Sequence, residues 1–126
     1  MVGETSISEF NSNKYVVERV NDIIAKLNAS FEMNDIDGVV KQLRALYKEI
    51  YPKLKDDEKQ VYGELCEVIL KAQALPADIT RMMGALSKGK ILFELEQVDI
   101  KLRYLADKHG LLMTNKEDPR FAALKT

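Results

Sequence analysis

The chain has 126 residues, of which 46% are hydrophobic and 31% are charged, and its formal net charge is −1. This length suits one domain, and the composition is too apolar for a disordered protein. The apolar runs are too short for a transmembrane helix. The small negative net charge argues against a strong electrostatic grip on nucleic acid.

Cysteine usage and the N-terminal residues indicate where the protein works. Cys66 is the only cysteine, which excludes an internal disulfide and favours a reducing compartment. Residues 1–13 are polar and lack the basic and then apolar pattern of a secretory signal. We therefore expect a cytoplasmic protein that does not enter a membrane, and we expect residues 1–12 to be flexible.

Two helices are predicted in the first half of the chain. The first has one apolar face, formed by Val16, Val20, Ile23, Ile24, Leu27 and Phe31. The second has another, formed by Ile36, Val39, Leu43, Leu46, Tyr47 and Ile50. Asp35 is a good N-cap for the second helix. Pro52 stops it, because proline lacks a backbone donor and disfavours helical geometry in the residue before it.

A third helix is predicted after a short link. Asp56 and Asp57 open it, because acidic residues suit the positive end of the helix dipole. Its apolar face consists of Val61, Leu65, Val68, Ile69 and Ala72. The shortness of the link predicts that the second and third helices form an antiparallel hairpin.

The last predicted helix begins near Asp78 and either runs on through Gly84 and Gly89 or bends there. It ends at Lys108–Gly110, where a basic residue suits the dipole and glycine suits a left-handed cap. No apolar–polar alternation typical of a strand persists. The sequence therefore predicts an all-α fold. Residues 1–126 form a single-domain antiparallel bundle of about four main helices, with residues 111–126 as an apolar C-terminal tail.

The last helix has two apolar faces. One contains Ile91, Leu95, Val98, Leu102 and Leu105, and the opposite one contains Phe93, Ile100 and Tyr104. Charged residues fill the flanks, namely Glu94, Glu96, Asp99, Lys101 and Arg103. A helix that only covers a core needs one apolar stripe. The second stripe therefore needs cover from the tail, from another copy of the chain or from a different protein.

Motifs that carry chemistry are incomplete in this sequence. The segment 84–90 matches a phosphate-binding loop, but Ile91 stands where that motif needs Ser or Thr for magnesium. The segment 35–38 matches part of an EF-hand calcium loop, but Met33 and Arg44 occupy ligand positions. One histidine and one cysteine make a poor case for a transition-metal site. We therefore expect no cofactor, no metal and no enzymatic activity.

We predict a non-catalytic protein–protein interaction or assembly module that docks through the second apolar face and the tail. Amphipathic helices and short apolar segments commonly dock into grooves. The predicted partner-binding residues are Phe93, Ile100, Tyr104, Leu111, Leu112, Met113 and Phe121. The partner is either another copy of the chain, giving a homo-oligomer, or a different protein.

The alternative is a nucleic-acid-binding accessory subunit. Residues 76–126 contain nine basic and seven acidic side chains, a balance of +2. Basic residues share one side of the last helix near Tyr104, and such an arrangement can follow a phosphate backbone and stack a base. The residues of this alternative site are Arg81, Lys88, Lys90, Lys101 and Lys108.

Overall fold

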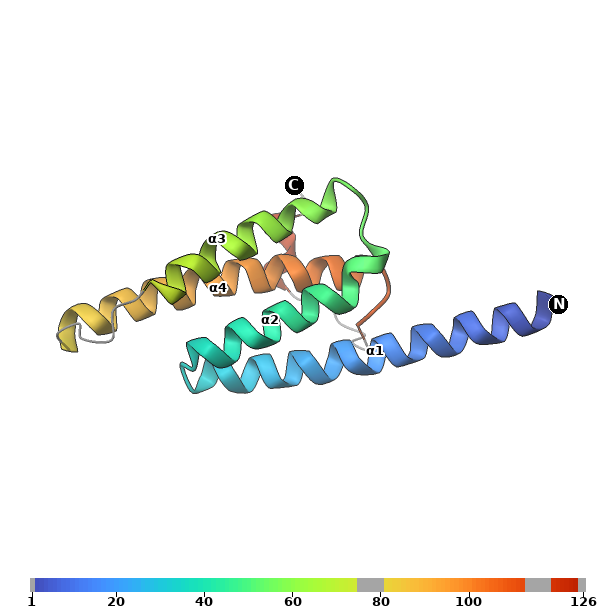
Figure 1. Cartoon of the computed structure of the whole chain (residues 1–126), viewed down its shortest axis with the longest axis horizontal. Coiled ribbons are helices and arrows are strands. Elements are labelled where there is room, and N and C mark those ends of the chain that lie inside the picture. Colours follow the sequence, from blue (N-terminus) through green and yellow to red (C-terminus); the bar gives the residue numbers. More distant parts are fainter. Residues whose placement is uncertain (1, 75–80, 113–118, 125–126) are drawn as a thin grey trace.

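The computed structural model describes residues 2–74, 81–112 and 119–124 (Figure 1). It contains the helices α1 (Val2–Glu32), α2 (Ile36–Ile50), α3 (Val61–Gln73) and α4 (Arg81–Lys108). Short 3-10 turns are η1 (Tyr51–Lys53), η2 (Glu58–Gln60) and η3 (Pro119–Leu124). The described residues contain no strand, which confirms the predicted all-α fold. In the same residues, no helix has both the length and the apolar character that crossing a bilayer requires.

The turn between α1 and α2 satisfies the ends of both helices. Asn34 adopts a left-handed conformation, with φ of 54°, and its N–H donates to the carbonyl of Phe31 at 3.0 Å. The N–H of Asp35 donates to the carbonyl of Ser30 at 2.9 Å, which completes a Schellman cap. Asp35 also caps α2, as predicted, because its carboxylate accepts from the N–H of Gly38 at 3.0 Å.

The link between α2 and α3 differs from the prediction in one respect. α2 ends just before η1, which contains Pro52, as the missing proline donor requires. The acidic pair Asp56–Asp57 precedes η2, however, and α3 begins only at Val61 without a side-chain cap. The expectation that this pair opens the third helix is therefore wrong. Glu58 organises the link instead, because its carboxylate accepts from the backbone N–H of Lys55 at 2.8 Å.

Helix α4 is continuous from Arg81 to Lys108, and the whole segment 84–90 lies inside it. A helical backbone cannot curl around phosphates, so this segment is not a phosphate-binding loop. The C-terminal cap is the predicted one. Gly110 has a φ of +73°, and the N–H of Leu111 donates to the carbonyl of Ala106 at 2.8 Å. This second Schellman cap turns the chain back toward the bundle.

Consecutive helices run in opposite directions in Figure 1. α1 packs on α2, α3 packs on α4, and α2 joins the two pairs by packing on α4. The predicted apolar faces meet in one core, whose fully buried side chains include Val20, Leu27, Val39, Leu43, Leu46, Ile50, Leu65, Leu95 and Leu102. Residues 2–12, expected as a flexible segment, belong to α1, whose N-terminal part extends beyond α2 (Figure 1).

Candidate functional site

The second apolar face of α4 is partly covered by the chain's own tail. Phe121, in η3, is 1% exposed, and its ring meets the ring of Tyr104 edge-on with 5.6 Å between centroids. Ile100 is half-buried, whereas Phe93 is 62% exposed. The tail therefore covers the Tyr104 end of this face and leaves the Phe93 end open.

The first residues of the tail belong to the core. Leu111 is buried, and its carbonyl accepts from the side-chain amide of Asn21 at 3.1 Å. Leu112 is half-buried against the same core. Met113 lies outside the described residues. Of the predicted partner-binding residues that the structure describes, Phe93 is therefore the exposed one.

Carboxylates of the chain itself engage two of the basic residues proposed for nucleic acid. Nζ of Lys101 lies 2.7 Å from Oε1 of Glu64 on α3. Nζ of Lys108 lies 2.8 Å from Oε2 of Glu58 in η2. These two lysines therefore hold α4 against the segment that runs from η2 into α3.

The other basic residues of that set stand apart from these pairs. Lys88 and Lys90 are exposed in the N-terminal half of α4. Neither forms an ion pair within the described part of the chain. The side chain of Arg81 lies outside the described residues. Among the described members of the basic set, only these two lysines lack a carboxylate partner.

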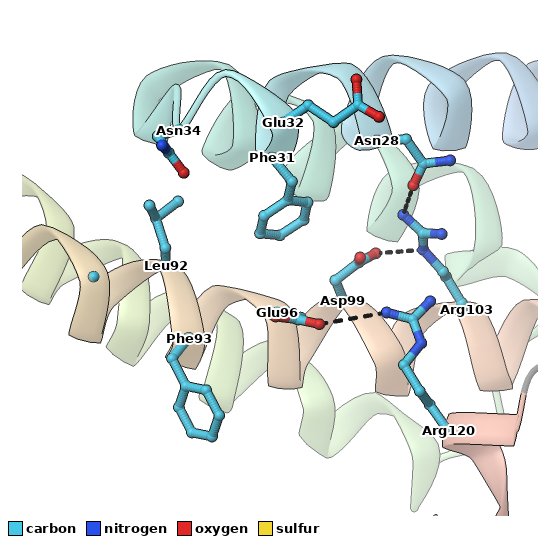
Figure 2. Close-up of a pocket in the computed structure, with 11 residues that line it drawn as sticks. Asn28, Phe31, Glu32, Asn34, Leu92, Phe93, Glu96, Asp99, Arg103 and Arg120 are labelled. Atoms are coloured by element: carbon cyan, nitrogen blue, oxygen red, sulfur yellow. Dashed lines mark hydrogen bonds and ion pairs between the residues drawn. The ribbon is translucent and has the colours of Figure 1, made fainter.

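One ion pair on the charged flanks of α4 is buried. Asp99 is 1% exposed and Arg103 is 8% exposed. Nε of Arg103 donates to Oδ1 of Asp99 at 2.8 Å, and its Nη2 donates to Oδ1 of Asn28 on α1 at 2.8 Å (Figure 2). These two flank positions therefore face α1.

The buried pair lines a polar recess between α1 and α4, here called the α1–α4 recess. Its volume is about 590 Å³, and its lining residues are Asn28, Phe31, Glu32, Asn34, Gly89, Leu92, Phe93, Glu96, Asp99, Arg103 and Arg120. Nη1 of Arg120 lies 3.6 Å from Oε1 of Glu96, which ties the tail to the recess (Figure 2). Burial raises the pKa of Asp99, while the charge and hydrogen bond of Arg103 oppose that shift. Two ion pairs, Arg103–Asp99 and Arg120–Glu96, thus lie in the recess, and the hydrogen bond from Arg103 to Asn28 links α4 to α1.

A second buried carboxylate fastens the link before α3 to the end of α4. Glu58 is 8% exposed. Its Oε2 accepts from Nζ of Lys108 at 2.8 Å, and its Oε1 lies 2.8 Å from Nε2 of His109. Burial acts to raise the pKa of Glu58. The hydrogen bonds from Lys108, from the Lys55 backbone and from His109 outweigh burial and lower this pKa to about 2.

A groove of different character lies between α2 and α3. It has a volume of about 540 Å³ and is called here the tyrosine groove. Its lining residues are Arg44, Tyr47 and Lys48 of α2, with Tyr62, Leu65, Cys66, Ile69, Leu70 and Gln73 of α3. Leu65 and Ile69 are buried and form the apolar base of the groove. The lining residues include no carboxylate.

Tyrosine rings gather at one end of this groove. The rings of Tyr47 and Tyr62 stack with 4.9 Å between centroids, and Tyr51 lies 5.7 Å from Tyr47. Nζ of Lys59 lies 4.9 Å above the ring of Tyr51. Tyr51 and Tyr62 are 47% and 51% exposed at this end, and Leu70, about two turns further along α3, is 66% exposed. This end therefore combines exposed aromatic surface with a neighbouring cation.

The tyrosine groove is also positively charged. Arg44 and Lys48 are exposed on α2, and neither is ion-paired with a carboxylate of the described residues. Burial and the neighbouring tyrosines raise the pKa of Tyr47, and a side-chain hydrogen bond with Cys66 raises the pKa of Tyr62. Both phenols stay neutral at physiological pH, so none of the described lining residues offsets the two positive charges.

The sequence pattern contains only a faint signal for this groove. Helical spacing assigns Tyr47 to the core face of α2 and leaves Tyr62 without a role. Tyr47 and Tyr51 are separated by one helical turn, and Tyr62 opens the next helix of a predicted hairpin. Three tyrosines that flank one hairpin link are the feature from which an aromatic surface between α2 and α3 was predictable.

Within the described residues, no group of three His, Cys, Asp or Glu side chains is placed to hold a metal ion. Comparison of the chain with models of protein families, with curated proteins and with solved structures gave no match. Function is therefore inferred from the surfaces of the chain itself.

Proposed function

We propose that this protein is a non-catalytic protein–protein interaction module of the cytoplasm, and that the tyrosine groove is its docking surface. The observation that carries the proposal is the concentration of exposed Tyr51, Tyr62 and Leu70 at and beside one groove with an apolar base. Clustered exposed apolar surface marks interaction sites on soluble proteins. Aromatic residues and arginine are also the residue types that dominate binding energy at interfaces.

This docking surface differs from the one expected from the sequence. The second apolar face of α4 receives Phe121 at its Tyr104 end, so the chain itself occupies that half. Phe93 remains accessible on this face. We assign it a secondary role, as a contact that a second copy of the chain can use in assembly.

A protein partner is favoured over nucleic acid by the use that the chain makes of its basic residues. Lys101 and Lys108 bind Glu64 and Glu58, and Arg103 is buried against Asp99. Ion pairs of this kind compete directly with phosphate contacts. Lys88 and Lys90, which pair with no carboxylate in the described part of the chain, make a short basic patch with no exposed aromatic ring described between them.

Selection of peptides from a random library displayed on phage tests this function without assuming the partner. Selection uses the wild-type protein alone, and binding of the selected peptides to the Leu70→Asp variant is measured afterwards. Leu70 is exposed, so the variant is expected to fold. The selected peptides should slow the reaction of Cys66, which is the only thiol in the chain and lines the groove, with a thiol reagent.

The matched control is Tyr15→Asp, which places the same charge on an exposed apolar residue of α1, outside both proposed surfaces. Leu70→Asp should weaken peptide binding by about tenfold or more, as loss of a central apolar anchor does. Tyr15→Asp should leave binding within about twofold. Enrichment of no peptide, or peptides that bind both variants as well as the wild type, would contradict a docking role for the groove.

A further inference from the structure

We infer that the segment which the tyrosine groove takes is an acidic amphipathic helix of a partner protein, an inference that rests on the docking function proposed above. The charge of the groove supports this choice. Arg44 and Lys48 stand on the α2 side without a described carboxylate partner. Lys59 lies over the ring of Tyr51 and is already paired with Asp56, so Arg44 and Lys48 supply the unbalanced charge. A partner that brings carboxylates to this rim gains complementary charge along it.

The shape of the groove supports a helix rather than an extended strand. The α3 side of the lining runs from Tyr62 to Gln73, about 17 Å at the rise of an α-helix, or roughly three turns. The described residues offer no sheet edge to which a strand could add. A helix that lies between α2 and α3 can place apolar side chains one turn apart onto Leu65 and Ile69. Its flanking positions then face the basic residues of α2.

The lining favours such a helix over single-stranded nucleic acid. The rings of Tyr47 and Tyr62 stack on each other, and Lys59 covers one face of Tyr51. These contacts reduce the free ring faces on which a base stacks. The buried leucine and isoleucine at the base suit aliphatic side chains instead. The carboxylate of Glu64 on α3 is not part of the groove lining and binds Lys101 of α4.

Two synthetic peptides of about 14 residues test the inference. Both carry the same leucine stripe at helical spacing; one has glutamate at the flanking positions and the other has lysine there. The readouts are the dissociation constant from fluorescence anisotropy and the protection of Cys66 from a thiol reagent. The acidic peptide should bind the wild-type protein about tenfold more tightly than the basic one, with the difference shrinking at high salt.

Charge reversal in the protein then locates the effect. The double variant Arg44→Glu with Lys48→Glu should reverse the preference, so that the basic peptide binds more tightly. The matched control is Lys88→Glu with Lys90→Glu, which makes the same change in net charge on two exposed lysines of α4 that pair with no described carboxylate. This control should leave the preference for the acidic peptide unchanged, because surface charges act mainly within about 10 Å at ordinary salt.

Three other results overturn the inference. If both peptides bind equally and protect Cys66 equally, the preference for an acidic partner is contradicted, while the proposal that the groove is a docking surface is retained. Protection of Cys66 by oligothymidine but by neither peptide assigns the groove to nucleic acid. If no probe protects Cys66, the proposed acidic helical partner is excluded. The library selection described above assumes neither a charge nor a helix, so it decides separately whether the groove binds peptides.

Discussion

The α1–α4 recess and the tyrosine groove have similar volumes, about 590 and 540 Å³, and lie between helices of the same bundle. They differ in what the chain does with its own charges. In the recess, Arg103 is hydrogen-bonded to Asp99 and Asn28, and Arg120 lies beside Glu96. In the groove, Arg44 and Lys48 face no described carboxylate. The volumes of the two cavities do not distinguish them, and it is the unpaired charge beside exposed apolar surface on which we base the proposal that the groove is a docking surface.

The largest expected effect is in the recess. Arg103→Ala should lower the free energy of unfolding by about 3–5 kcal/mol, because it leaves the buried Asp99 carboxylate without its partner. Urea denaturation measures this loss. The double variant Asp99→Leu with Arg103→Met should recover most of it, because apolar residues of similar volume need no partner. A loss below about 1 kcal/mol in Arg103→Ala would show that the pair does not fix α1 on α4.

Truncation of two core leucines, at a similar loss of stability, tests whether binding depends on the groove. Leu65→Ala and Leu102→Ala should each destabilise by about 2–5 kcal/mol, because both side chains are fully buried. Leu65 forms the base of the tyrosine groove and Leu102 does not. Peptide binding, measured under conditions where both variants remain folded, should therefore weaken in Leu65→Ala alone. Equal weakening in both variants would mean that binding reports general loosening of the bundle.

Lowering the pH should change the contributions of the two buried carboxylates, Glu58 and Asp99, to stability in opposite directions. The pKa of Glu58 is lowered from 4.5 to about 2, so its contribution to stability is present above pH 4.5 and is lost as the pH falls toward 2. The pKa of Asp99 is raised above 3.8, so the folded state holds that proton more tightly and acid favours folding at this site. Glu58→Gln should cost about 1–3 kcal/mol at neutral pH.

The pH dependence of unfolding separates these contributions. Glu58→Gln should flatten the loss of stability between pH 4.5 and about 2, because it removes the group whose pKa is lowered. Asp99→Asn should steepen the same loss, because it removes the group that acid favours. Parallel curves for the wild type and Glu58→Gln would show that the contacts of Glu58 with Lys108 and His109 do not shape acid stability.

The smallest effect on stability is expected in the groove. Leu70→Asp should change the free energy of unfolding by less than about 0.5 kcal/mol, because this side chain is 66% exposed. The same variant is expected to lose peptide binding. A variant that is unaffected in thermal denaturation and defective in binding places the function of Leu70 at the surface. A large drop in stability would instead assign Leu70 to packing.

Much of the fold was predictable because it depends on local rules. The apolar faces at helical spacing, the cap at Asp35 and the left-handed Gly110 all appear where the sequence indicates them. The start of the third helix was predicted wrongly from Asp56–Asp57. Glu58 accepts a hydrogen bond from the backbone N–H of Lys55, and a 3-10 turn precedes α3. The sequence left open whether the last helix bends at Gly84 and Gly89, and the structure shows one continuous helix there.

The site was less predictable because it depends on residues far apart in the chain. Asp99 and Arg103 have the spacing of a helical ion pair, and that spacing is visible in the sequence. Their burial depends on Asn28, 75 positions away from Arg103, which spacing cannot supply. In the same way, Phe121 reaches Tyr104 only after the cap at Gly110 redirects the chain. For this reason, less of the predicted partner-binding surface is exposed than the sequence pattern indicates.

The α1–α2 turn has a consequence for how the length of this chain can change. Asp35 closes α1 through its N–H and opens α2 through its carboxylate, so the turn has no spare residue. Inserting one residue there would rotate α2 by about 100° and carry Leu43 and Leu46 off the core. A side chain at position 38 would meet the Asp35 carboxylate and Ser30. Insertions and tags should therefore be placed at other sites. Gly38, in the segment 35–38 that matches part of a calcium loop, leaves the space in which the Asp35 side chain caps α2.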